Sequence, residues 1–411
     1  MLWMLWACTS GTESTPAKES EAPEESEIVV IDDSQTESEP EDSEPVVDTA
    51  AEYQEYLALY DTEQLHEIVI ELDEVGLSAL AATPYEYTEA VVTLDGERFE
   101  KVGVRLRGNA EDNNLTAGKP SFKIRLNEYQ SGQNVGGVTR LSLNNMNDDR
   151  SQVREVLGWW IWAQAGMPAP RAAFTTLAYV ANGETVPLGL YANIETPDGN
   201  FLDHHMDDAS GDLWEAQDSA DFTSAGVSHF DLAAGEGDVV SLQDTWQAVW
   251  AGGSEFYPTA DTVLQMDEFL DFWSWSILVG HSGGYPYERN DYYLYADPSL
   301  SGRISFVPWD LEGAWDTGMD WEELSGVVGL KCHVDPACLA MLTDRVEDSL
   351  DSYEAMNIEE KASDLYQLTD LTVATDPRVK YSYSEVEAAR TSLAYRLSVW
   401  PDRIRREVGL H

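Results

Sequence analysis

Basic residues are scarce in this sequence. Its 411 residues include 24 Lys and Arg against 76 Asp and Glu, which gives a formal net charge of −52. Nucleic acids and anionic membranes are bound mainly through side-chain cations that neutralise phosphate, so we expect neither as a direct partner. A surface this acidic suits cations, basic proteins or a saline medium. To bind a triphosphate, such a chain needs local positive charge or a metal ion.

Cysteine is also rare, with Cys8, Cys332 and Cys338 as the only three. The last two enclose five residues, a spacing that can close a small loop. A structural zinc site needs four ligands, and only His333 lies beside this pair. We therefore favour a Cys332–Cys338 disulfide, provided that the protein is exported to an oxidising compartment.

Long apolar runs are absent, and no stretch reaches the roughly 18 residues of a membrane-spanning helix. Residues 1–8 read MLWMLWAC, a short apolar segment that resembles the end of a lipoprotein signal with Cys8 as the lipidated residue. It has no basic n-region, which a start codon assigned too late would explain, and an ordinary frayed N-terminus is the alternative. We expect an exported protein, either a membrane-anchored lipoprotein of the bacterial envelope or a secreted one, with membrane contact only through that lipid.

Residues 9–50 are rich in Ser, Thr, Glu, Asp and Pro. Such a segment buries too little apolar surface to offset the entropy of ordering it, so we predict a disordered linker extended by its like charges. The remainder, 51–411, has the composition of a folded domain.

Periodicity within 51–411 predicts an α+β fold, with an antiparallel β-rich N-terminal part and a mostly helical C-terminal part. The segment 207–240 is rich in Asp, Ser and Gly and predicts a loop insertion. The Asp95-Gly96 pair predicts a hairpin, and Asp149 marks the expected start of a helix. Strands are expected at 66–73, 87–94, 102–107, 121–126, 139–143, 174–180, 186–194, 291–296 and 304–308, and further helices at 242–250, 266–279 and within 341–408.

Several basic residues fall on or beside neighbouring predicted strands. Alternation places Arg105 and Arg107 on one face of their strand, and Lys123 and Arg125 on one face of the next, with Lys119 just before it. Cations on adjacent strands suit a wall that binds phosphate, with Arg107, Lys119 and Lys123 as candidates. The alternative is an ordinary solvated strand face with Arg stems covering the core.

Four polar positions invite a further role. Glu155 could orient a phosphate-binding lysine from its helix, or it could be an ordinary surface charge. Glu195 closes an apolar strand, where a carboxylate needs a partner. Asp310 follows a short buried strand and precedes a turn, which is a natural position for a Mg²⁺ ligand. Asn290 or Asp291 could supply the second ligand.

Six motifs follow one another along the chain: Arg107-Gly108-Asn109, Lys119-Pro120-Ser121-Phe122-Lys123, Arg154-Glu155 with Gly166-Met167-Pro168-Ala169-Pro170, Gly189-Leu190-Tyr191 with Glu195, Tyr292-Tyr293-Leu294-Tyr295, and Pro308-Trp309-Asp310-Leu311. In this order they resemble the CotH family, the spore-coat-protein-H-like proteins with an atypical protein-kinase-like fold. The resemblance covers about residues 65–345 and leaves 346–411 as a helical extension. It implies an ATP-dependent protein Ser/Thr kinase that uses Mg²⁺, with Lys119 or Lys123 on the ATP phosphates and Asp310 on the metal.

One departure from the family pattern concerns the catalytic base. Many members carry an Asp before the Tyr-Tyr-Leu-Tyr strand, and here Gly283 or Gly284 takes that place. Glycine has no carboxylate to accept a proton. His281, Glu288 or Asp291 could substitute.

Two functions therefore remain open: an active kinase acting on a protein substrate, and a catalytically inactive pseudokinase that binds or scaffolds a partner in the cell envelope. We expect a monomer in either case.

Overall fold

The computed structural model describes residues 49–108, 115, 118–237, 240–251, 256–315 and 319–409. Contacts divide the chain into two units, Met1–Val47 and Asp48–His411. The predicted lipidation site Cys8 and nearly all of the predicted linker 9–50 lie outside the described residues. Thr49 and Ala50, the last two residues of that linker, belong to the first helix, α1 (Thr49–Leu59). Among the described residues, no helix combines the length and apolar character needed to cross a membrane.

Seven strands form a closed barrel in the order β1-β2-β3-β4-β5-β7-β6. Neighbours pair antiparallel, as predicted, except that β1 and β6 run parallel. A closed ring with an odd number of strands cannot alternate in direction throughout, so closure requires one parallel pair. The strands are β1 (Leu65–Leu72), β2 (Thr88–Leu94), β3 (Glu97–Arg107), β4 (Ser121–Arg125), β5 (Arg140–Asn144), β6 (Ala172–Ala181) and β7 (Glu184–Glu195).

The predicted hairpin at Asp95-Gly96 joins β2 to β3. Both residues have positive φ, 49° for Asp95 and 89° for Gly96, as the tight two-residue turns of hairpins require. Alternate side chains of the barrel strands point inward and form one apolar core, which includes Ile68, Val92, Val104, Leu106, Phe122, Ile124, Leu141 and Tyr191.

A second sheet has the order β11-β10-β8-β9. It consists of β8 (Asp212–Ala216), β9 (Phe230–Ala234), β10 (Tyr292–Asp297) and β11 (Arg303–Pro308). The prediction of a loop insertion over 207–240 was therefore wrong, because this segment contributes β8, β9 and the short helix η1 (Gly226–His229). Strand β8 pairs with β10, about 80 residues away. Local composition carries no signal for a partner at that distance.

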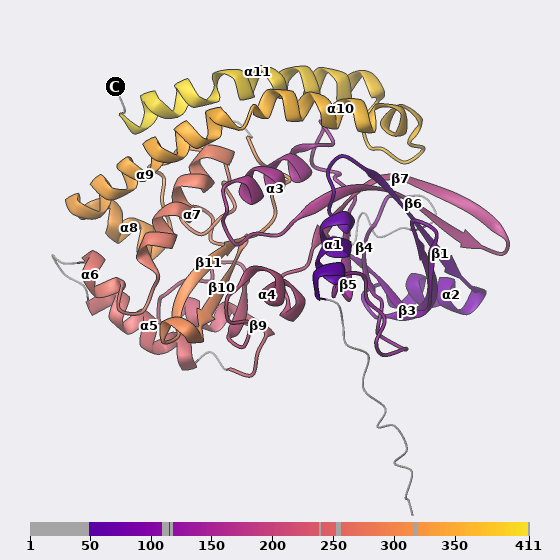
Figure 1. Ribbon diagram of the computed structural model, residues 1–411, viewed down its shortest axis with the longest axis horizontal. Helices are drawn as coiled ribbons and strands as arrows, with labels where there is room; N and C mark the ends of the chain where they lie inside the picture. The colour runs from indigo at the N-terminus through magenta and orange to yellow at the C-terminus, as the bar shows by residue number, and fades with distance from the viewer. Residues whose placement is uncertain are drawn as a thin grey trace, which may run out of the picture. The chain divides into compact units, whose positions relative to one another are not determined.

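Helices make up most of the remainder and, as predicted, dominate the C-terminal part. In Figure 1, α10 and α11 lie side by side, and α10 also packs against α3 and β7. The helices after α1 are α2 (Glu74–Ala82), α3 (Arg154–Gln164), α4 (Gly199–His205), α5 (Val240–Ala251), α6 (Phe256–Ala260), α7 (Met266–Val279), α8 (Val327–Val334), α9 (Pro336–Ala355), α10 (Ile358–Thr375) and α11 (Tyr383–Val408), with the short η2 (Pro298–Leu300) between β10 and β11.

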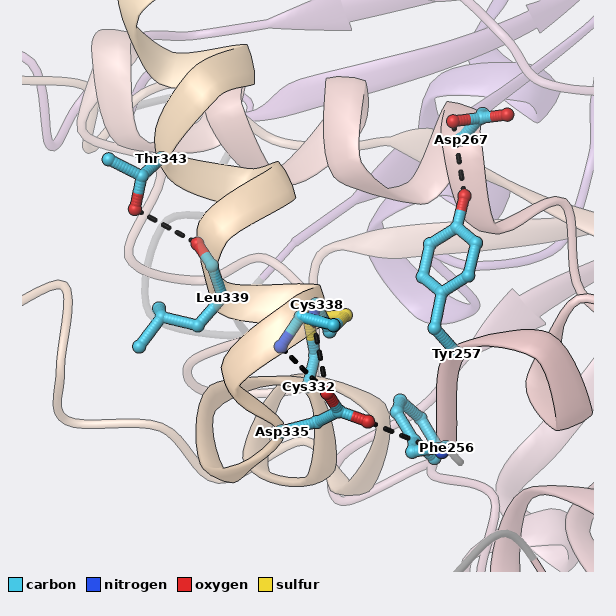
Figure 2. Close-up of a disulfide and its surroundings, with 9 residues drawn as sticks. Phe256, Tyr257, Asp267, Cys332, Asp335, Cys338, Leu339 and Thr343 are labelled. Atoms are coloured by element: carbon cyan, nitrogen blue, oxygen red, sulfur yellow. Dashed lines mark hydrogen bonds between the residues drawn. A yellow bond between two sulfur atoms is a disulfide. The ribbon is translucent and has the colours of Figure 1, made fainter. Parts of the chain in front are cut away.

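The structure places Cys332 and Cys338 in a disulfide that joins α8 to α9 (Figure 2). Asp335 lies between them and caps α9, with Oδ1 accepting hydrogen bonds from the backbone N–H groups of Ala337 and Cys338. Its other oxygen accepts from the backbone N–H of Phe256 at the start of α6. The closed loop thus fastens three helices together.

Candidate functional site

Strands β10 and β11 bring two aspartates to one edge of the second sheet. Tyr292 pairs with Pro308 at the end of the two-stranded ladder. Beyond it, the backbone N–H of Trp309 donates to the carbonyl of Asp291 at 3.1 Å. Asp291 directly precedes β10, and Asp310 is the second residue after β11, so both lie at this edge. Asp310 has a φ of 48°, a left-handed conformation that turns the chain sharply.

Three carboxylates gather around that turn. Glu155, Asp310 and Glu312 each offer an oxygen, and these oxygens lie within 4.8 Å of one another. Glu155 is fully buried on α3. Its Oε1 accepts from the indole N–H of Trp159 at 2.8 Å and from the backbone N–H of Leu311 at 3.3 Å. Its Oε2 is buried, and no hydrogen-bond donor within the described residues reaches it.

This donor set fits a divalent cation. A buried carboxylate oxygen without a partner is costly, and a cation held jointly with Asp310 and Glu312 removes that cost. Oxygen ligands are those that Mg²⁺ prefers, and one or two carboxylates suffice when phosphate and water complete the shell. Glu155, Asp310 and Glu312 are therefore the residues that could hold the metal.

Glu312 ties this cluster to the barrel. Its Oε1 accepts from the backbone N–H groups of Asp148 at 2.6 Å and Asp149 at 3.1 Å, and its Oε2 accepts from the amide of Asn144 at 3.3 Å. Burial and the neighbouring Asp310 raise the pKa of Glu312 to about 7. Burial, and then the charges of Asp310 and Glu312, also hold the pKa of Glu155 well above its usual range.

Asp149, whose backbone N–H donates to Glu312, also determines where α3 begins. The sequence predicted a helix from Asp149, whereas α3 begins at Arg154. The Asp149 carboxylate accepts from the backbone N–H groups of Ser151, Val153 and Arg154. Asp149 thus satisfies the first free N–H groups from a preceding turn, and this turn presents its own backbone N–H to Glu312.

Asp291 lies beside the cluster with its immediate neighbours. Asn290 and Glu288 are exposed, and the Asn290 amide donates to Asp291 Oδ1 at 2.9 Å. Burial raises the pKa of Asp291 to about 8, and the charges of Asp310, Glu288 and Asp218 add to the effect. The negative charges of Asp310 and Asp291 therefore interact directly.

A row of cations lies on the outer face of strands β3, β4 and β5. Arg105 pairs with Lys123 across β3 and β4, and Arg125 pairs with Arg140 across β4 and β5. Their strand neighbours point inward to the core, so these basic side chains share the outer face, as alternation predicted. Burial, and the nearby charge of Arg107, lower the pKa of Lys123 to about 8. Within the described residues, the Lys123 ammonium forms no ion pair.

The cationic face meets the acidic edge at Arg107. Its guanidinium lies 6.0 Å from the ring centre of Trp309, the residue that directly precedes Asp310. It also donates to the Ser142 hydroxyl at 2.5 Å. Cations that can face phosphate and carboxylates that can hold a metal thus border the same region.

Lys119 is held apart from this row. Its ammonium pairs with Asp376 at 2.8 Å, and the two side chains are only 2% and 1% exposed. Asp376 follows α10 and also accepts from the backbone N–H of Leu190. Burial lowers the pKa of Lys119. In this structure Lys119 joins the barrel to the C-terminal helices.

Glu195 belongs to another network. Its carboxylate accepts from the Tyr56 hydroxyl at 3.0 Å and from the backbone N–H of Arg171 at 3.0 Å, and it lies 2.9 Å from His205 Nε2. Tyr56 also stacks on the ring of His204. None of these partners belongs to the acidic cluster, so Glu195 fastens α1 to the barrel in this structure.

His281 supports the acidic edge from behind. Its Nε2 lies 2.8 Å from the carbonyl of Trp309 and donates to it. Burial lowers the pKa of His281 to about 4, so the ring is neutral at physiological pH and holds the residue before Asp310.

Several residues of this region were missed in the sequence. Glu312 stands two positions after Asp310, so its acidic type and proximity were available as a signal. Arg140 lies on a strand that the sequence did predict. Asp376 is 257 residues from its partner Lys119, and no local pattern indicates such a pair.

A family model described as CotH kinase protein matches residues 104–400. This chain belongs to the CotH kinase family. The match covers most of the chain, from within β3 to within α11. The sequence motifs had indicated a resemblance over about 65–345. A CotH protein is kinase-like, and that class uses nucleotide and metal in general, which agrees with the buried acidic cluster. The comparison with curated proteins returned no match.

Proposed function

We propose that this CotH protein is an ATP-dependent protein kinase that transfers phosphate to Ser or Thr of a protein substrate. One observation carries the proposal: the cationic face of the barrel and the carboxylate cluster meet where Arg107 lies over Trp309, next to Asp310. Phosphoryl transfer depends mainly on positioning and on neutralising phosphate charge. A phosphate chain between these two surfaces would have cations on one side and metal ligands on the other.

The residues divide this work between them. Asp310, Glu312 and Glu155 would hold Mg²⁺, which when bound neutralises the phosphate oxygens and aligns the chain. The left-handed turn at Asp310 and the hydrogen bond from the backbone N–H of Glu312 to Asp310 Oδ1, at 3.1 Å, fix the first carboxylate. His281 holds the carbonyl just before it.

Lys123 and Arg107 are the cations that we assign to phosphate. Lys123 has a half-buried side chain near Arg107, Arg105 and Arg140, with Glu215 as the acidic residue whose charge also reaches it. Within the described residues, no carboxylate forms an ion pair with it. An incoming anion would relieve the repulsion among these cations. Lys119 already has a buried carboxylate partner, and a phosphate would have to displace it at considerable cost.

The N-terminal sequence supports a proposal about where the protein acts. We propose that the chain is exported and held at the bacterial envelope by a lipid on Cys8, with residues 9–48 as a tether. Its substrate or partner would then be an envelope or secreted protein. A basic or Ser/Thr-rich acceptor suits the acidic surface.

An inactive pseudokinase is the second candidate. The observation that favours it is the glycine pair Gly283-Gly284, which provides no carboxylate where the family pattern places one. Such a protein would still bind nucleotide and would act as an envelope scaffold.

The test is transfer of label from γ-³²P-ATP with Mg²⁺, to the full chain itself or to casein-like acceptors. Asp310→Asn is compared with Asp231→Asn, which removes an exposed carboxylate on β9. We expect transfer by the wild type and by Asp231→Asn, and a loss of roughly 100-fold or more in Asp310→Asn. Equal transfer by Asp310→Asn would contradict the proposal, and nucleotide binding without any transfer would favour the pseudokinase.

A further inference from the structure

The carboxylate of Asp291 occupies the space in which a side chain at position 283 would lie. A Cβ built on Gly283 would come within 1.9 Å of Asp291 Oδ2 and 2.9 Å of its Cγ. The carbonyl of Gly283 accepts from the backbone N–H groups of both Asn290, at 3.1 Å, and Asp291, at 3.0 Å. Backbone hydrogen bonds therefore hold Gly283 against Asn290 and Asp291, with the Asp291 carboxylate lying over Gly283.

The backbone of Gly283 does not itself require glycine. Its φ lies outside the left-handed region that disfavours side chains, so only the Asp291 carboxylate excludes a Cβ there. Gly284 differs, because a Cβ on it would come within 2.7 Å of the His281 ring. At position 283, therefore, the space that a side chain would fill is occupied by the Asp291 carboxylate.

Of the three candidate substitutes for the base, Asp291 has the required placement. Its Oδ1 accepts from Asn290, and no hydrogen-bond donor within the described residues reaches Oδ2. It lies at the strand edge that presents Asp310. The His281 ring is buried, with Nε2 engaged by the carbonyl of Trp309. Glu288 is exposed, and its negative charge contributes to the raised pKa of Asp291.

We propose that Asp291 is the proton-accepting carboxylate of this kinase, supplied from position 291 into the space left by Gly283. The inference rests on the proposed function. In the step, the acceptor hydroxyl oxygen forms a bond to the γ-phosphorus of ATP. The bond from that phosphorus to the oxygen bridging to the β-phosphate breaks, and ADP leaves with its electron pair. The hydroxyl proton passes to Oδ2 of the ionised Asp291 carboxylate.

The experiment transfers the carboxylate from position 291 to position 283. The full chain is prepared as wild type, Asp291→Asn, the double variant Gly283→Asp/Asp291→Gly, and the charge control Asp231→Asn. For each, ATP binding with Mg²⁺, the rate of phosphate transfer at saturating ATP, and the thermal melting temperature are measured. Binding and melting separate a loss of chemistry from a loss of folding.

We expect Asp291→Asn to bind ATP within a few-fold of the wild type and to transfer phosphate roughly 10²- to 10⁴-fold more slowly. The double variant should recover at least a tenth of the wild-type rate, because its carboxylate returns to the same space from position 283. Asp231→Asn should match the wild type.

Two results overturn the inference while leaving the proposed function standing: transfer by Asp291→Asn at the wild-type rate, or a folded, ATP-binding double variant as slow as Asp291→Asn. An absence of ATP binding and transfer in the wild type overturns the proposed function, and this inference with it.

Discussion

Replacing Lys119 by Met tests whether this lysine joins the barrel to the helices or binds phosphate. The substitution leaves the Asp376 carboxylate buried, at 1% exposure, without its cation. Breaking a buried ion pair in this way typically costs about 3–5 kcal/mol. Asp376 keeps hydrogen bonds from the backbone N–H groups of Leu190, at 3.0 Å, and Arg378, at 2.8 Å, so we expect the lower end, about 3 kcal/mol.

The assay is urea unfolding of the full chain followed by Trp fluorescence, together with an ATP titration. Lys119→Met should lower the free energy of unfolding by this amount while the folded protein binds ATP within a few-fold of the wild type. In Lys119→Met/Asp376→Asn, a neutral amide replaces the unpaired carboxylate, and most of the stability should return. If Lys119→Met leaves stability unchanged and weakens ATP binding tenfold or more, Lys119 is a phosphate ligand and our assignment of Lys123 fails.

Two further predictions concern pH and the disulfide. Burial and Asp310 raise the pKa of Glu312 from 4.5 to about 7, so the folded chain binds a proton there that the unfolded chain releases. Without divalent cations, the melting temperature should therefore fall as pH rises from about 5 to 8, and more steeply for the wild type than for Glu312→Gln; equal slopes would refute this. Replacing Cys332 and Cys338 together by Ala should lower the free energy of unfolding by about 2 kcal/mol, as measured by urea unfolding; an unchanged value would show that the loop needs no covalent closure.

The sequence predicted best the features that local pattern determines. Strict alternation in 102–107 and 121–126 indicated strands with cations on one face, and the structure has β3 and β4 there with that face outward. The hairpin at Asp95-Gly96 is equally local, because both residues tolerate positive φ. The helical character of 341–408 was also predicted, but the individual helices there were not.

Pairings between distant segments could not be predicted. Strand β8 lies in a polar segment and is a strand because β10 pairs with it. The parallel closure of β1 against β6 depends on the number of strands in the ring. For the site, residue type indicated Asp310, but the Lys119–Asp376 pair and the placement of Asp291 over Gly283 arise only from tertiary contacts.

The most direct test of the central claim is an equilibrium titration of ATP into the full chain, with and without Mg²⁺, for the wild type and Lys123→Met. The account predicts binding that Mg²⁺ strengthens at least tenfold in the wild type, since metal and cations hold the phosphates together, and binding that Lys123→Met weakens by a similar factor. Binding that is indifferent to both Mg²⁺ and Lys123 would contradict the claim that the carboxylate cluster and the cationic face of the barrel form one nucleotide site.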